Sequence, residues 1–157
     1  MSRSATFWNH VNEHRGPGVL LLSVLTSWKK VADTVGMDAV DVMSGLFDVV
    51  TGLATPTTQV TARLSTTVFG AYWPELGAEA NAIRWLARWL PMNIEAPTCT
   101  LRLEVLTCAL TREAGEAGRI CYLRAQTAVD DAVSFLPLEE RYPGLPLTWD
   151  QVTGGER

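Results

Sequence analysis

Apolar residues recur at every third or fourth position in the first half of the chain. They cover one side of residues 19–35, and Gly36 suits the C-terminal cap of a helix there. Asp38 suits the N-terminal cap of a second helix, which the same spacing carries to about Leu53. The two segments therefore predict a pair of helices joined by a short turn. The apolar face of the first helix is formed by Leu20, Leu21, Val24, Leu25, Trp28, Val31 and Val35.

Prolines divide the next stretch into two more expected helices. Pro56 and Pro74 suit the first turn of a helix, and Pro91 ends the second one. In the first of these segments, β-branched side chains favour a strand, whereas apolar residues spaced by four favour a helix. We expect the helix, because three apolar residues keep that spacing: Val60, Leu64 and Val68.

A linker at residues 92–97 precedes a region whose pattern allows two interpretations. We favour two helices, because Ala, Leu, Glu and Arg dominate the composition there. The first begins at Thr98 and ends near Glu113, before a break that contains glycines. The second carries an apolar stripe of Tyr122, Ala125, Val129, Ala132, Val133 and Leu136.

The alternative for this region is a β-hairpin. Apolar and charged residues alternate over 98–106, and this segment would pair with 119–125 around Gly115 and Gly118. From Pro137 onward we expect an irregular tail on the surface, because proline and glycine interrupt any regular helix. Three apolar side chains would hold this tail in place: Leu145, Leu147 and Trp149.

These patterns predict an all-α fold, a compact bundle of about five or six helices with an irregular C-terminal tail. The alternative is an α+β fold with a β-hairpin around residues 98–125. A chain of 157 residues is most simply a single domain. Its expected parts are an N-terminal arm (1–18), a helical layer (19–91), a second layer (98–136) and the irregular tail (137–157).

The composition indicates extensive apolar contact surfaces. Hydrophobic residues make up 47% of the chain and charged residues 19%, whereas average soluble domains carry roughly 25% charged residues. Six tryptophans are hard to bury in a domain of this size, and tryptophan is enriched at protein interfaces. The net charge of −4 argues against nucleic acid as a partner, because a basic surface supplies most of that affinity.

Cysteine usage and the longest apolar run bear on the location of the protein. Cys99, Cys108 and Cys121 are odd in number and form no C-x-x-C pair, so neither a disulfide framework nor a structural zinc site is expected. The run from Val19 to Leu25 is too short to span a bilayer, which needs about 20 apolar residues. We therefore expect a cytoplasmic protein that is not integral to a membrane.

The sharpest motif is His10-Val11-Asn12-Glu13-His14, which matches the inverted zinc-protease pattern H-x-x-E-H. On a helix both histidines share a face and would bind zinc, with Glu13 as the general base. The motif lies in a short arm, however, and the sequence singles out no third ligand. A zinc-dependent hydrolase is therefore an alternative, while our main expectation includes no metal, no cofactor and no catalytic residue.

The most informative segment contains two tryptophans and two arginines. Trp85 and Trp89 are four residues apart, and so are Arg84 and Arg88, so each pair is stacked on one side of a helix. Neither residue type is a base or a nucleophile at neutral pH. We therefore expect these four residues to form a partner-binding surface. The alternatives are that Trp85 and Trp89 pack into the core with the arginines at its flank, or that the segment is a peripheral membrane-surface helix.

Together these features predict a small, non-enzymatic, cytoplasmic protein-protein interaction or assembly protein. Its partner would be another protein or a second copy of itself, and a small-molecule ligand is not expected. Accessory and inhibitor proteins carried by viruses or mobile elements have this character. Neither G-x-S-x-G nor a phosphate-binding glycine pattern occurs in the chain, which agrees with this expectation.

Overall fold

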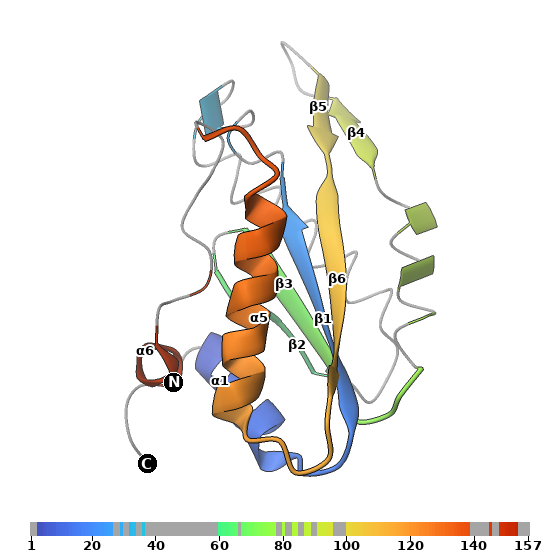
Figure 1. Ribbon diagram of the computed structural model, residues 1–157. Coiled ribbons are helices and arrows are strands. Elements are labelled where there is room, and N and C mark those ends of the chain that lie inside the picture. Colours follow the sequence, from blue (N-terminus) through green and yellow to red (C-terminus); the bar gives the residue numbers. More distant parts are fainter. Residues whose placement is uncertain are drawn as a thin grey trace.

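The computed structural model describes residues 3–26, 29, 32–33, 36, 60–65, 67–77, 80, 83–84, 87–88, 91–95, 100–138, 145 and 148–153. Its helices and strands are shown in Figure 1. In chain order they are α1 (Arg3–Glu13), β1 (Gly18–Leu25), β2 (Val60–Arg63), β3 (Val68–Trp73), β4 (Met92–Glu95), β5 (Thr100–Leu103), β6 (Val105–Arg112), α5 (Gly118–Val133) and α6 (Trp149–Thr153).

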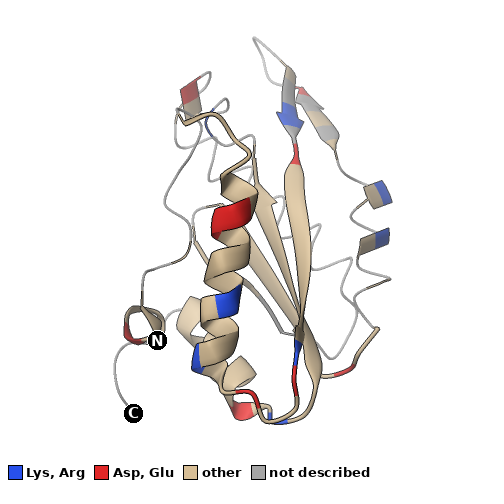
Figure 2. Ribbon diagram, in the orientation of Figure 1, with Lys and Arg blue, Asp and Glu red and all other residues tan. Residues whose placement is uncertain are grey.

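A four-stranded antiparallel sheet forms the centre of the described structure. Its strand order is β2-β3-β1-β6, so β1 lies between β3 and β6. Neither β1 nor β3 carries a charged residue (Figure 2), and every residue of both strands is buried. The predicted helix is therefore wrong over residues 19–25. A strand buried on both faces reads as a continuous apolar run, which has no period that would distinguish it from a helix.

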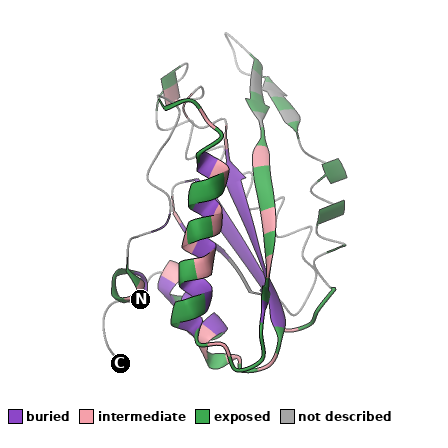
Figure 3. Cartoon of the chain, viewed as in Figure 1, coloured by how far each residue is buried: buried purple, intermediate pink, exposed green. Residues whose placement is uncertain are grey.

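Helices α1 and α5 lie against one face of this sheet (Figures 1 and 3). Helix α1 replaces the predicted N-terminal arm, because Phe7, Trp8 and Val11 are completely buried in the core. Three apolar positions within one turn and a half are too few to show a period in the sequence. Helix α5 confirms the expected second helix of this region. Its buried residues include four of the predicted stripe: Tyr122, Ala125, Val129 and Val133.

The segment after Pro56 contains the hairpin β2–β3 where a helix was predicted. Val60 pairs with Tyr72, and the turn is closed by the Leu64 amide, which donates to the Val68 carbonyl at 2.7 Å. The β-branched residues of this segment therefore decide its structure. Such side chains pack well on a pleated surface, and the neighbouring strand supplies that surface only after folding.

The region after the linker consists of strands followed by helix α5. Strand β4 pairs with β5, and β6 pairs with β1 along its whole length. The predicted helix from Thr98 to Glu113 is therefore wrong. The hairpin between 98–106 and 119–125 is also wrong, because its second arm lies in helix α5. The described chain is an α+β structure with helices on an antiparallel sheet, and the predicted all-α bundle is incorrect.

Two further predictions concern the segment 38–53 and the C-terminal tail. The helix expected at 38–53 lies outside the described residues. In the tail, Leu145 is buried and Trp149 packs against the core, as expected, although Trp149 begins the short helix α6. No helix of the described residues is long and apolar enough to cross a membrane.

Candidate functional site

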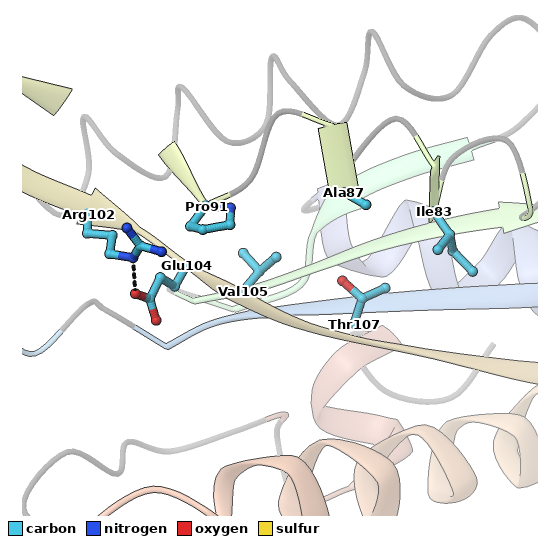
Figure 4. A pocket seen from close by; sticks show the side chains of 7 residues that line it. All are labelled: Ile83, Ala87, Pro91, Arg102, Glu104, Val105 and Thr107. Atoms are coloured by element: carbon cyan, nitrogen blue, oxygen red, sulfur yellow. Dashed lines mark hydrogen bonds and ion pairs between the residues drawn. The ribbon is translucent and has the colours of Figure 1, made fainter. Parts of the chain in front are cut away.

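A cavity of about 350 Å³ lies beside strand β6, on the sheet face opposite helix α5 (Figure 4). One wall consists of Val105 and Thr107 from β6. The other wall consists of Ile83, Ala87 and Pro91, from a segment whose described residues 83–84 and 87–88 are helical. The volume lies at the lower end of the range for small-molecule pockets, about 300–1,000 Å³.

An ion pair borders one end of this cavity. The Nε of Arg102 donates to the carboxylate of Glu104, and about half of each side chain is exposed (Figure 4). The main-chain carbonyl of Glu104 also accepts from the Thr26 amide at 3.0 Å and from the Thr26 hydroxyl at 3.3 Å. These bonds tie the charged end of the cavity to the end of β1. An exposed ion pair of this kind contributes little to stability.

A pair of hydroxyl groups links the cavity wall to the centre of the sheet. The hydroxyls of Thr107 and Ser23 are 3.3 Å apart and share a hydrogen bond. Ser23 is buried although it is polar, and this bond satisfies it. The cavity wall is therefore connected to the buried centre of the sheet by a polar pair.

The turn between β2 and β3 carries two further hydroxyls. Ser65 Oγ and Thr67 Oγ1 are buried and have no hydrogen-bond partner in the structure. The carbonyl of Thr67 accepts from the Leu25 amide at 2.8 Å, and Leu25 pairs with Val105 of the cavity wall. Two strand spacings therefore separate Thr67 from Val105, or about 10 Å. Unsatisfied buried hydroxyls are uncommon, so this turn is the place where the polar groups of the hairpin are least well satisfied.

A second polar cluster lies at the opposite end of the sheet. The Nδ1 of His14 and the hydroxyl of Tyr72 are 2.6 Å apart. Arg112 is fully buried, and its guanidinium donates to the carbonyls of Val11 and Glu116. Val11 belongs to the last turn of α1, so Arg112 holds the end of that helix against the loop before α5. Such an arrangement is a structural clamp rather than a reactive site.

The electrostatics of this clamp agree with that role. Burial lowers the pKa of His14, and the positive charge of Arg112 lowers it further. Burial also raises the pKa of Tyr72. Both shifts favour neutral side chains, between which a hydrogen bond can form at neutral pH.

The zinc alternative finds no support in this geometry. His10 and Glu13 are exposed on α1, whereas His14 is engaged with Tyr72. Within the residues that the structure describes, no group of three or more His, Cys, Asp or Glu side chains is placed to hold a metal ion. A catalytic zinc site needs three protein ligands, and only two histidines lie near each other here.

The predicted partner-binding residues are only partly visible. Arg84 and Arg88 are exposed and helical, as expected, while Trp85 and Trp89 lie outside the described residues. The structure adds what the sequence did not show, namely that the neighbours Ile83 and Ala87 line the cavity. The sequence feature that could have pointed to this cavity is the alternation of apolar and charged residues around Arg102, which indicates a strand with one exposed, charged side.

Solved structures of GGDEF domains resemble this chain. The diguanylate cyclase SiaD from Pseudomonas aeruginosa, in complex with its activator SiaC, has a TM-score of 0.68 at 18% identity, over 83% of this chain and 51% of SiaD. The GGDEF domain of DgcB from Caulobacter crescentus, in complex with c-di-GMP, has a TM-score of 0.65 at 16% identity, over 83% and 79% of the two chains.

An active GGEEF domain of a diguanylate cyclase from Vibrio cholerae gives a TM-score of 0.64 at 13% identity, over 81% of this chain and 83% of that one. The chain has the fold of GGDEF domains. It spans about half the length of SiaD. No family model matches the sequence. No curated protein matches it either.

This fold corrects the functional prediction. A non-enzymatic interaction or assembly protein, of viral or mobile-element type, was predicted from an all-α bundle, and the fold is instead one found in diguanylate cyclases. The expectation of no small-molecule ligand is also wrong for this fold, because the DgcB domain is in complex with c-di-GMP. A protein partner agrees with the SiaD complex, in which the partner is an activator protein.

This sequence lacks the motifs after which these domains are named. Neither Gly-Gly-Asp-Glu-Phe nor Gly-Gly-Glu-Glu-Phe occurs in this chain. Its one pair of adjacent glycines is Gly154-Gly155, followed by Glu156 and Arg157. Any function must therefore be argued from the residues that this chain itself places around the sheet.

Proposed function

We propose that this chain is a guanine-nucleotide-binding domain with the GGDEF fold, and that the cavity beside β6 receives one nucleoside unit of the ligand. The observation that carries the proposal is an apolar cavity of about 350 Å³ with the Arg102–Glu104 pair at its edge. The complex of the DgcB domain with c-di-GMP supports this class of ligand. The volume suits one nucleoside rather than a whole cyclic dinucleotide, whose remainder would lie outside the opening.

The two charged side chains match the polar groups of such a ligand. A guanidinium presents paired N–H donors, which suit either a phosphate or the O6 and N7 acceptors of guanine. The carboxylate of Glu104 would accept from N1–H and the amino group of guanine, and adenine lacks the N1–H donor. Ile83, Pro91 and Val105 would cover the faces of the base with apolar surface. The pair therefore predicts a preference for guanine over adenine.

Titration calorimetry with c-di-GMP, GTP and ATP tests the proposal. We expect the two guanine ligands to bind and ATP to bind at least roughly tenfold more weakly, a difference of about 1.4 kcal/mol. Arg102→Ala should weaken guanine-nucleotide binding by a similar factor. The matched control is Arg119→Ala, which removes an exposed arginine of α5 on the other side of the sheet.

Two results would contradict the proposal. One is the absence of binding of either guanine ligand at millimolar concentration. The other is equal binding by wild type and Arg102→Ala. Incubation with GTP and Mg²⁺, followed by chromatography for c-di-GMP, measures directly whether bound GTP is also turned over.

A further inference from the structure

The outer surface of α5 is apolar on a side that faces solvent. Opposite its buried stripe, Ile120 and Leu123 are 47% and 44% exposed. Together with Leu110 of β6 they border an open groove of about 450 Å³ between the helix and this strand. Figure 3 shows the outer turns of α5 as exposed. An apolar groove beside a solvent-facing helix is a surface that a partner would cover.

A second apolar feature follows the C-terminal end of the same helix. Phe135 and Leu138 are 84% and 76% exposed, more than any other large hydrophobic residue that the structure describes. A helix rises about 1.5 Å per residue, so Phe135 lies about 20 Å along the axis from Ile120. Within one copy, the projecting Phe135 therefore cannot fill the groove beside Ile120.

The charges along α5 run against the helix dipole. Arg119 and Arg124 lie in the N-terminal half, and Asp130 and Asp131 lie near the C-terminal end (Figure 2). The first turn has no acidic residue and the last turn has no basic one. A helix dipole favours the reverse order, so the dipole does not stabilise this distribution. A second α5 in antiparallel orientation would present each charge with its opposite.

One pair of these charges is available for such a contact. All hydrogen bonds of the Arg124 side chain use Nη1, which donates to the Glu116 carboxylate at 2.9 Å and to the Thr111 carbonyl at 3.0 Å. The other two guanidinium nitrogens can donate elsewhere. The carboxylate of Asp131 has no ion-pair partner among the described residues.

We propose that α5 is a self-association surface on which a second copy of this chain binds in antiparallel orientation. When the pair is centred between Thr127 and Ala128, Ile120 lies level with Phe135 of the second copy. In the same register Arg124 lies level with Asp131 of the second copy. Two-fold symmetry repeats both contacts, so each projecting phenylalanine fills the groove of the other copy. This inference does not depend on nucleotide binding, which involves the opposite face of the sheet.

Light scattering after size-exclusion chromatography, over a concentration series, tests the association. We expect wild type to shift from monomer to dimer as concentration rises. Leu123→Asp and Asp131→Arg should each raise the dimer dissociation constant at least roughly tenfold. Leu76→Asp is the matched control, because Leu76 is similarly exposed but lies outside α5. Far-UV circular dichroism must remain unchanged in every variant.

A cysteine placed at the centre of the interface tests the register. Thr127→Cys should form a disulfide-linked dimer under mild oxidation, because this position lies next to the two-fold axis, within one residue of its own copy. Asp150→Cys, on α6, should remain monomeric. The proposal is overturned if wild type stays monomeric throughout the series, if Leu123→Asp dimerises as wild type does, or if Thr127→Cys gives no more linked dimer than Asp150→Cys.

Discussion

Replacing the buried arginine of the clamp is the sharpest test of how this fold is held together. Arg112 is fully buried, and its guanidinium donates to the carbonyls of Val11 and Glu116. Arg112→Met keeps most of the aliphatic volume and removes every donor. Hydrogen bonds from a charged donor contribute about 1.5–3 kcal/mol each. Part of this is offset, because a buried guanidinium without a carboxylate partner is costly to desolvate.

The net expectation is a loss of about 3 kcal/mol, since the Val11 carbonyl is buried and would find no replacement partner. With a urea m-value of about 2 kcal/mol/M, the midpoint should fall by about 1.5 M. Urea titration followed by circular dichroism measures this shift. Arg112→Lys should lie between wild type and Arg112→Met, because one ammonium cannot span both carbonyls. A midpoint for Arg112→Met within error of that for the exposed control Arg119→Met would refute the clamp.

Three other predictions concern single side chains. Because His14 has a lowered pKa in the folded state, stability should be constant above about pH 6.5 and fall as the pH drops further, and His14→Gln should flatten this profile in urea midpoints. Gly18→Ala should lower the melting temperature more than Gly115→Ala does. Its Cβ would clash with the Tyr72 hydroxyl and would lie 2.7 Å from the main-chain carbonyl oxygen of Trp73, whereas Gly115→Ala meets only the strain of a positive φ, about 1–2 kcal/mol. Burial raises the pKa of Cys121 to about 11, so mass spectrometry should find this thiol unmodified by iodoacetamide at neutral pH in the folded protein.

An element can be predicted from the sequence when its apolar residues recur at a regular spacing. Helix α5 is predicted correctly, because its buried residues recur at helical spacing and its charged residues lie outside that stripe. Strand β1 is not predicted correctly, because both of its faces are buried and its apolar run therefore shows no alternation of apolar and polar positions. The assignment of a helix around Val60 failed for a related reason. A strand is stabilised by the neighbouring strand, and that neighbour is chosen by the fold.

The candidate site is still harder to find from the sequence. Its walls come from Ile83 and Ala87 on one side and from Val105 and Thr107 on the other, and only folding brings the two together. The motifs after which GGDEF domains are named are also missing from the chain, so the resemblance to these domains is one of backbone fold. A search for chemical motifs therefore selected His10 and its neighbours, which form no metal site in the described structure.

The central position of β1 has a consequence for synthesis on the ribosome. This strand is complete at Leu25, but its pairing partner on one side ends at Trp73 and the other ends at Arg112. At about 5–20 residues per second, several seconds pass before the second partner has been made. Throughout that time a strand without a charged residue has an unpaired edge and is open to association with other nascent chains. We therefore expect the yield of folded protein in cells to depend on chaperones that bind emerging apolar segments.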